Sequence, residues 1–483
     1  MDKAAWHLVR KRRVSRSPPK WVLIAIAIAT SSFVRAAATS LPFPATLIAQ
    51  FDASSITGVS SGSPISSWTD SIGGISATET NSAHYPTYLS NRINGLPGVK
   101  FGGNADLCMP LTNPIQAAID GARSIFGSGY TIFITFKTLG PVTRGTIIGA
   151  SAGFARGFHV YADGSNVGEH TLFANIPYSG QTSFSTVALE TFSTGTHSSG
   201  GNKNLSLIYV NGGAVASTTT PNQTTDGHQI CIGGQSLKIY GNVEVYDIVA
   251  WASPLTPPQL KQVEQWAVRR YGLPAPWAGS SAYNVFFGDS ITEGVGATGG
   301  IVNQPCCLTA RLLGLQLGQW DCLGIGGIST SSMSLLAPSW VDPMPAMLNM
   351  KVNLVGFEWF NQGGAPAIRF DKALSFLRAR KMVANLRTVW GTSTSYKGDP
   401  DANRASYDNA FDSNTANIQS YIDSYMRLHD NAEIGRIEPP SSWSTYCPTC
   451  TPAYFSDGIH PNSAGYGDLA KIYAAGIKAL PQR

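Results

Sequence analysis

The chain has 483 residues, enough for about two to four domains, and its hydrophobic content of 43% is ordinary for globular proteins. Its net charge of +5 comes from residues 1–38, which hold eight basic side chains and one acidic one; the remainder has 26 Lys+Arg against 28 Asp+Glu, a net charge of −2. This balance excludes the strongly basic surface of nucleic-acid-binding proteins, so no nucleic-acid partner is expected.

Residues 1–38 have the layout of an export signal. A basic stretch precedes an apolar run from Trp21 to about Val34, and three alanines follow. The run is shorter than the ~20 residues that a membrane-spanning helix needs, and small residues follow it as at a signal-peptide cleavage site. We expect a signal peptide, with an uncleaved N-terminal anchor as the alternative. The protein would then be secreted, extracellular or periplasmic, without membrane contact unless this segment is retained.

The seven cysteines suit an exported chain with a few disulfides and one thiol left over. Cys306, Cys307 and Cys322 lie near one another in the sequence, and Cys447 and Cys450 form a CxxC pair. Neither a second CxxC nor a histidine pair completes a zinc site, and no thioredoxin-like context surrounds the pair. A small disulfide is therefore favoured there, and the sequence leaves the pairings open.

Residues 46–273 predict an all-β sandwich. Short runs rich in β-branched and aromatic residues alternate with Gly, Ser, Asn and Thr, as in such folds. The runs cover residues 130–136, 145–149, 205–210 and 243–249. Asn211-Gly212-Gly213 is a hairpin turn signal.

A single helix is expected to close this region. Thr256 is suited to cap its N-terminus, and Pro257 and Pro258 suit the first turn. The apolar face would be formed by Leu260, Val263, Ala267 and Tyr271. Residues 274–281, rich in Pro, Gly and Ser, are expected to be a linker.

The first region resembles the concanavalin A-like, or laminin-G-like, jelly-roll domains of secreted bacterial proteins. The segments that carry the resemblance are residues 68–71, 85–88, 96–101 and the end of the closing helix at 270–273. The resemblance implies a sandwich that binds carbohydrate or serves as a spacer. Trp68 and Tyr88 are candidates for stacking on sugars, although core or edge positions are favoured for both.

Residues 282–483 alternate strands and helices, which predicts an α/β domain with a mainly parallel sheet. Strands are expected at residues 283–287, 352–357 and 388–390, and helices near 308–315, 370–377, 418–426 and 469–477. In such sheets, sites form at the carboxyl ends of the strands. Ser290 follows the first of these strands.

Two motifs at the ends of this region suit acyl transfer. Gly288-Asp289-Ser290-Ile291-Thr292 follows a strand, where a serine hydroxyl can be exposed, although a serine at such a position can also be a helix cap. In Asp457-Gly458-Ile459-His460-Pro461, the aspartate can orient the histidine three residues later. We expect Ser290 to be the nucleophile, His460 the general base and Asp457 its orienting partner.

Together these motifs resemble the GDSL esterases and lipases, also called SGNH hydrolases, over roughly residues 281–483. The resemblance implies a three-layer, flavodoxin-like α/β fold and an oxyanion hole that includes the backbone N–H of Ser290. Gly327 matches the second glycine block of the family, with Gly326 as the alternative.

The third oxyanion donor departs from the family pattern. The usual Gly-x-Asn-Asp is absent after the strand at 352–357, where Asn361 and Gln362 stand instead. Asn361 would supply the family asparagine. Alternatively, Phe360-Asn361-Gln362-Gly363 resembles the aromatic-x-Gln-Gly of carbohydrate acetylesterases, which makes Gln362 the donor.

The sequence thus predicts a secreted serine esterase that acts on O-acetyl esters, with an acylated polysaccharide as the expected substrate. The alternative is a non-catalytic carbohydrate-binding or cell-surface protein with a decayed hydrolase domain, and a third option is an acyltransferase. We expect neither a metal ion nor a cofactor, because no glycine-rich nucleotide-binding motif and no metal-ligand set is visible.

Overall fold

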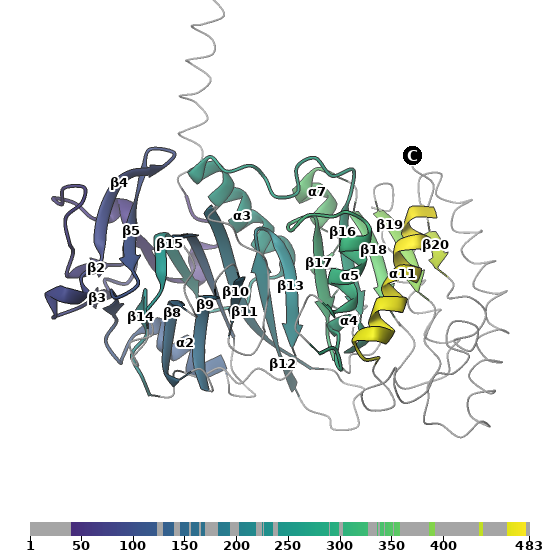
Figure 1. The fold of residues 1–483 in the computed structure, drawn as a ribbon, viewed down its shortest axis with the longest axis horizontal. Helices are drawn as coiled ribbons and strands as arrows, with labels where there is room; N and C mark the ends of the chain where they lie inside the picture. Colours follow the sequence, from purple (N-terminus) through teal and green to yellow (C-terminus); the bar gives the residue numbers. More distant parts are fainter. Residues whose placement is uncertain are drawn as a thin grey trace, which may run out of the picture. The chain divides into compact units, whose positions relative to one another are not determined.

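The computed structural model describes most of the chain between residues 40 and 479 (Figure 1). The described ranges are 40–122, 129–139, 145–153, 156–163, 166–169, 182–193, 202–218, 225, 227–234, 240–288, 290–298, 303–326, 336, 339–341, 343–350, 352–357, 386–391, 434–437 and 461–479. The expected signal peptide lies outside them. From Pro42 onward the described residues belong to one compact unit. None of the helices described is both long and apolar enough to cross a membrane.

The larger of two antiparallel sheets has eight strands in the order β13-β12-β11-β7-β15-β5-β4, with β1 paired to β15. Its strands are β1 (Leu47–Asp52), β4 (Thr87–Ile93), β5 (Leu96–Gly102), β7 (Tyr130–Thr138), β11 (Thr182–Ser193), β12 (Asn202–Val210), β13 (Gly213–Thr218) and β15 (Asn242–Trp251). The four strand-like runs predicted from the sequence fall in β7, β12, β15 and β8 (Gly145–Gly153) of the second sheet, so these predictions are confirmed.

The second antiparallel sheet has seven strands in the order β10-β9-β8-β14-β6-β3-β2. Its strands are β2 (Ser67–Thr69), β3 (Ser76–Thr78), β6 (Leu107–Cys108), β8 (Gly145–Gly153), β9 (Arg156–Asp163), β10 (Asn166–Glu169) and β14 (Cys231–Ile232). A disulfide joins Cys108 to Cys231 across the β6–β14 pair.

One apolar core combines buried side chains from both antiparallel sheets, as in a β-sandwich. Trp68 belongs to this core: it is 1% exposed, and its indole N–H donates to the Asp52 carbonyl at 3.2 Å. Tyr88 packs against the same core from a half-buried position. Both residues therefore occupy the core or edge positions favoured by the sequence, and Trp68 is not available to stack on a sugar.

The predicted hairpin and closing helix are both present. Asn211 and Gly212 connect β12 to β13 with φ angles of 47° and 84°, the left-handed pair that a two-residue hairpin turn requires. Helix α3 (Pro257–Tyr271) begins after Thr256, whose N–H donates to the Gln259 side chain at 2.8 Å. The expected apolar face of α3 is buried. Shorter helical segments are η1 (Pro44–Thr46), η2 (Ala53–Ser55), η3 (Ser82–His84) and α2 (Pro114–Ala122).

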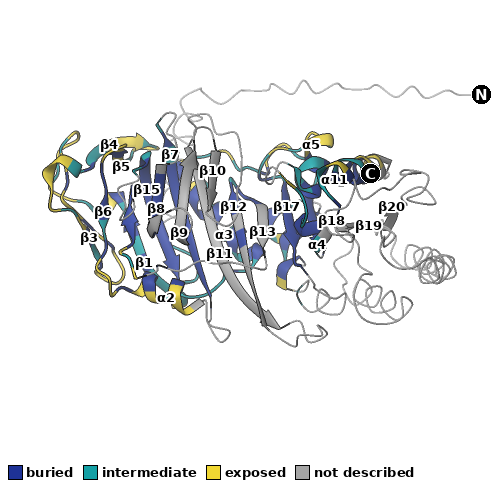
Figure 2. Ribbon diagram, turned by 60° about the horizontal axis from the view of Figure 1, so that its bottom comes forward, coloured by how far each residue is buried: buried dark blue, intermediate teal, exposed yellow. Residues whose placement is uncertain are grey.

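The third sheet is parallel and has five strands in the order β17-β16-β18-β19-β20. Its strands are β16 (Tyr283–Gly288), β17 (Trp320–Gly324), β18 (Val352–Phe357), β19 (Leu386–Gly391) and β20 (Ile434–Ile437). All three strands predicted for this region are confirmed as β16, β18 and β19. Figure 2 shows β17 in the dark blue of buried residues, and β16 is buried throughout its length.

Helices α5 (Pro305–Leu312) and α11 (Ser463–Ala479) pack on the parallel sheet (Figure 1). Side chains from both helices share a buried cluster with Phe286 of β16 and Trp320 of β17. Two shorter helices are α4 (Ser290–Glu293) and α7 (Met344–Leu348). Helices α5 and α11 match two sequence predictions, and the helices predicted near 370–377 and 418–426 lie outside the described residues.

The β12–β13 hairpin contacts the parallel sheet directly. Ala214 N–H donates to Asp321 Oδ1 of β17 at 2.7 Å, and the Tyr283 hydroxyl of β16 donates to the Gly212 carbonyl at 3.1 Å. Val210 of β12 belongs to the apolar cluster of the parallel sheet. The antiparallel and parallel parts of the described chain therefore share buried contacts.

Two glycines allow this close approach. A Cβ on Gly213 would lie 2.7 Å from the Trp320 carbonyl oxygen, and a Cβ on Gly318 would lie 2.2 Å from the Asn211 carbonyl oxygen. Any larger residue at either position would force the two backbones apart.

Candidate active site

Ser290 comes directly after the turn that follows strand β16, which lies between β17 and β18 in the sheet. Gly288 ends the strand, and Ser290 begins the single-turn helix α4 in a half-buried position. The N–H groups of Gly294 and Val295 both donate to the Ser290 carbonyl at 3.0 Å. The backbone around the expected nucleophile is therefore closed into a compact turn at the carboxyl end of β16.

Strand β17 supports this turn from the neighbouring position in the sheet. A Cβ on Gly324, the last residue of β17, would lie 2.1 Å from the backbone nitrogen of Glu293. The N–H of Ile325 donates to the Gly288 carbonyl at 2.9 Å, which extends the pairing to the point where both strands end. Only glycine at position 324 lets α4 lie this close to the strand.

The start of helix α11 is hydrogen-bonded to the loop that follows Ser290. The Thr298 N–H donates to Ser463 Oγ at 2.8 Å, and that hydroxyl donates to the Thr298 carbonyl at 2.9 Å. The Tyr466 hydroxyl donates to the Val295 carbonyl at 2.7 Å. Ser463 is the third residue after position 460, so the chain leaving the expected histidine is fixed beside the chain leaving Ser290.

Most of the predicted site residues lie outside the described part of the chain. These are Asp457, His460, Gly327, Asn361 and Gln362, and their side chains are not placed. The structure describes Ser290 and the alternative Gly326, which is buried.

The strand register nevertheless shows where the chain enters the undescribed segments. Gly288 pairs with Gly324 of β17 on one side and with Phe357 of β18 on the other. Gly327 is the third residue after β17, and Asn361 is the fourth after β18. The segments that carry Ser290, Gly327 and Asn361 therefore leave three adjacent strands at the same edge of the sheet.

A disulfide that the sequence left open lies against the Ser290 turn. Cys306 of α5 is bonded to Cys322 of β17. Their sulfur atoms lie 3.4 Å and 3.3 Å from the carbonyl oxygen of Thr292, respectively. Among the cysteines that the structure describes, Cys307 is the free thiol, and burial raises its pKa despite the nearby Arg311 guanidinium.

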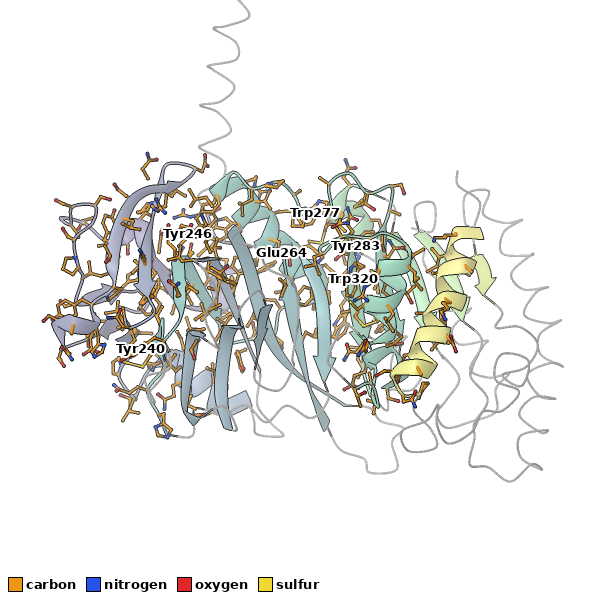
Figure 3. All side chains as sticks on the ribbon, in the orientation of Figure 1. Tyr240, Tyr246, Glu264, Trp277, Tyr283 and Trp320 are labelled. Atoms are coloured by element: carbon orange, nitrogen blue, oxygen red, sulfur yellow. A yellow bond between two sulfur atoms is a disulfide. The ribbon has the colours of Figure 1, made fainter. Side chains whose placement is uncertain are left out.

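A cluster of charged and polar side chains lies where α3 meets the parallel sheet. Figure 3 labels two of its members, Glu264 and Tyr283. Lys261 Nζ lies 3.4 Å from Glu264 Oε2 and 3.3 Å from Asp321 Oδ1, and it also donates to the Gly212 carbonyl. The Tyr283 hydroxyl donates to Asp321 Oδ1 at 2.8 Å. The side chains of Lys261, Glu264 and Asp321 are fully buried.

Burial raises the pKa of Glu264 to about 7, and the nearby Asp321 adds to the rise while Lys261 opposes it. One ammonium group faces two carboxylates here, which physically favours keeping a proton on one of them. The cluster is enclosed and lies on strand β17 before its carboxyl end, so we assign it to the junction between the sheets.

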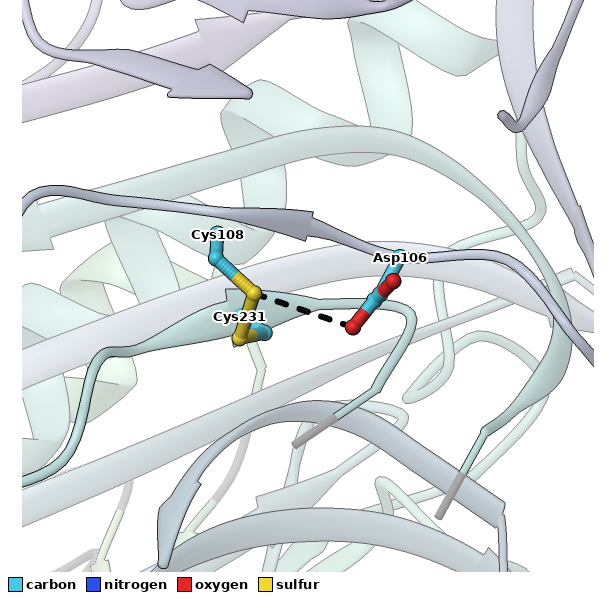
Figure 4. Close-up of side chains that lie close together, drawn as sticks. All are labelled: Asp106, Cys108 and Cys231. Carbon is cyan, nitrogen blue, oxygen red and sulfur yellow. Dashed lines mark hydrogen bonds between the residues drawn. A yellow bond between two sulfur atoms is a disulfide. The ribbon is translucent and has the colours of Figure 1, made fainter. Parts of the chain in front are cut away.

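Asp106, Cys108 and Cys231 come together in the antiparallel part (Figure 4). The Cys108 sulfur lies 3.7 Å from Asp106 Oδ2. Both sulfurs are joined in a disulfide, so they are not thiolates and do not offer the ligands that a metal ion needs. As described, this group does not fit a metal site.

No protein-family model and no curated protein matches the chain. Solved structures with similar parts include a mutant of Trypanosoma rangeli sialidase displaying trans-sialidase activity, at 15% identity and a TM-score of 0.32. The match covers 52% of this chain and 40% of that one.

Two other solved structures with similar parts are an esterase and a domain of an arabinanase. A two-domain esterase active on acetylated mannans is 16% identical with a TM-score of 0.27, over 42% of this chain and 51% of its own. Domain 4 of an extracellular arabinanase from Geobacillus stearothermophilus is 16% identical with a TM-score of 0.30, over 46% of this chain and 98% of its own. All three proteins are carbohydrate-active, but similarities this weak carry no argument about the activity of this chain.

Proposed function

We propose that the chain is a serine esterase with Ser290 as its nucleophile. The observation that carries the proposal is the pair of tethers from Ser463 and Tyr466 to the loop after Ser290. They hold the chain that leaves position 460 beside the chain that leaves position 290. These tethers support a site that combines Ser290 with His460, 170 positions later in the sequence.

In the proposed mechanism, His460 removes the proton from the Ser290 hydroxyl as the oxygen attacks an ester carbonyl. Asp457 orients the imidazole and stabilises the imidazolium that forms. The alcohol leaves with a proton from His460, and water then releases the acid from the acyl-enzyme. The Ser290 N–H, the Gly327 N–H and the amide of Asn361 or Gln362 would stabilise the oxyanion.

The strand order supports assigning this part of the chain to an SGNH-type hydrolase domain. Numbered along the chain, the parallel strands lie in the order 2-1-3-4-5, which is the order of flavodoxin-like sheets. Such sheets bind ligands beyond the carboxyl ends of their strands, which is where Ser290 stands. The three-layer domain and its boundaries at 282–483, with a jelly-roll sandwich at 46–273, are part of the proposal.

We infer that the substrates are O-acetyl esters on carbohydrate and that the protein is secreted. The resemblance of residues 360–363 to carbohydrate acetylesterases supports the acetyl group. The lectin-like sandwich supports a polysaccharide carrier, and the basic and apolar leader supports export.

Labelling of the purified protein with a fluorophosphonate probe tests this proposal. We expect the wild type to be labelled, and Ser290→Ala to lose labelling because the reactive oxygen is gone. Ser339→Ala is the matched control, since it removes an exposed serine hydroxyl that donates to the nearby Leu336 carbonyl at 3.0 Å. Turnover in Ser290→Ala should fall by several orders of magnitude, roughly the 10⁴- to 10⁶-fold loss typical of a lost nucleophile.

Labelling that persists in Ser290→Ala would refute the assignment of the nucleophile. A well-folded wild type that neither reacts with the probe nor hydrolyses p-nitrophenyl acetate would refute the esterase. That result would favour a non-catalytic carbohydrate-binding protein.

A further inference from the structure

We propose that the Cys306–Cys322 disulfide positions Ser290 for catalysis. The proposal rests on the proposed function, in which Ser290 is the nucleophile. It assigns to this disulfide a role in turnover in addition to any role in stability.

The first observation is the contact between the disulfide and the Ser290 turn. Both sulfurs lie within 3.4 Å of the carbonyl oxygen of Thr292, the third residue of α4. A disulfide sulfur carries no proton, so these are close packing contacts, and sulfur is polarizable enough to make them favourable. Thr292 is 0% exposed, and Cys306 and Cys322 are each 1% exposed, so no solvent separates these atoms.

The second observation is that α4 has little means of holding itself in place. It is four residues long, a single turn. A turn of this length is not stable alone, because fixing its dihedral angles costs more than its few hydrogen bonds return. The position of Ser290 therefore depends on what packs around the turn.

The third observation is that α4 is confined by two elements that the disulfide joins. Gly324 of β17 touches the backbone of Glu293, and Cys322 stands two residues earlier on the same strand. Cys306 comes from α5, which contacts α4 through the Cys306 sulfur and the Thr292 carbonyl oxygen. The bond closes a span of 16 residues between the two cysteines, so it fixes the distance between the strand and the helix that enclose the turn.

This confinement matters for catalysis because a nucleophile must be held in a near-attack geometry. A displacement of about 1 Å can cost about 100-fold in rate even when it originates away from the reacting atoms. Loss of the bridge should therefore lower kcat, whereas KM should change little, since both cysteines are buried and do not contact the substrate directly.

The Cys108–Cys231 disulfide provides a matched control in the same chain. It joins β6 to β14 in the antiparallel part and closes a span of 123 residues. The longer loop predicts a loss of stability at least as large as that for the Cys306–Cys322 bridge. If stability alone controlled activity, the control variant would be the more impaired of the two.

The experiment compares Cys306→Ala/Cys322→Ala with Cys108→Ala/Cys231→Ala in the full chain. Both variants and the reference carry Cys307→Ala, so that the Cys307 thiol does not form new pairs. We expect kcat on p-nitrophenyl acetate to fall about 10- to 100-fold in the first variant, with KM within about twofold. The control variant should keep kcat within about twofold at a temperature where both remain folded.

Hydrogen exchange gives a second measurement that does not depend on catalysis. The Gly294 and Val295 amides donate to the Ser290 carbonyl, so their exchange reports whether the turn is held. We expect their exchange to quicken at least about tenfold in the first variant and to stay unchanged in the control.

Equal losses of kcat in both variants, or unchanged kcat and exchange in the first, would overturn the proposal. A wild type without esterase activity would refute the proposed function instead. In that case the exchange measurement still decides whether the disulfide holds the turn.

Discussion

At the scale of single residues, Gly324 determines how closely the Ser290 turn approaches the sheet. A methyl group there would lie 2.1 Å from the Glu293 nitrogen and 2.4 Å from its Cα, and both are backbone atoms. Backbone atoms yield less readily than the end of a flexible side chain, so α4 itself would have to move.

We therefore expect Gly324→Ala to reduce the rate of fluorophosphonate labelling by about 10- to 100-fold and stability by about 1–3 kcal/mol. Gly467→Ala is the matched control, because no atom of the described residues lies within 4 Å of its would-be Cβ on helix α11. That variant should gain about 0.5–1 kcal/mol, since alanine is the better helix former. Labelling kinetics and denaturant titrations measure both. Unchanged labelling in Gly324→Ala would show that the turn does not need this approach.

At the scale of elements, helix α11 links the two ends of the proposed hydrolase region. Asn462 caps it, accepting from the N–H groups of Ala464 and Gly465 at 3.1 Å and 3.2 Å. Tyr466, one turn further on, reaches the loop after Ser290. The helix therefore begins at a fixed place relative to the nucleophile turn.

Tyr466→Phe should remove this tether with little other change, because only the hydroxyl is lost. We expect a loss of about 1 kcal/mol in the free energy of unfolding, and a several-fold fall in kcat as the chain near position 460 loosens. Lys471→Ala, on the exposed side of the same helix, should change the free energy of unfolding by no more than about 0.5 kcal/mol and leave kcat unchanged. An unaltered kcat in Tyr466→Phe would argue against α11 as the anchor of the general base.

Much of the element pattern was predictable because local chemistry determines it. The β-branched and aromatic content of β7, β15 and β18 predicts strands, and the capping residues of α3 predict a helix. β17 was missed because Asp321 stands in the middle of a short apolar run. The structure shows why the charge is tolerated: a backbone N–H, a tyrosine and a lysine surround that carboxylate.

The candidate site was predictable in part. The motif around Ser290 predicts its place after a strand, and the structure confirms that place. The Cys306–Cys322 pairing and the Tyr466 tether could not be predicted, because both depend on which distant segments the fold brings together. No periodicity or spacing in the sequence carries that information.

At the scale of the whole molecule, the Lys261 cluster makes the junction between the sheets sensitive to pH. The pKa of Glu264 is about 7 in the folded chain, against 4.5 for an ordinary glutamate, because burial disfavours its charge. Between these values the folded state holds a proton that the unfolded state has released. Stability from this group is therefore present below pH 4.5 and is lost as the pH rises to about 7.

Glu264→Gln should remove this dependence, since glutamine does not titrate. Between pH 4.5 and about pH 7, we expect the free energy of unfolding of the wild type to fall relative to that of the variant by up to about 1.4 kcal/mol per pH unit. Above about pH 7 we expect no further fall. Denaturant titrations at pH 4, 5, 6, 7 and 8 measure the difference. Parallel pH profiles for the two proteins would contradict it.

The glycine contacts at the junction also bear on how this gene can evolve. Gly213 and Gly318 bring the backbone of the hairpin against the backbone at the start of β17, and at both positions an added Cβ would meet backbone atoms. A sandwich acquired by recombination from another protein would have to present the same bare turn and a lysine to pair with Asp321 of β17. The two halves therefore have to diverge together, and a shuffled chimera should fold only when its donor supplies both features.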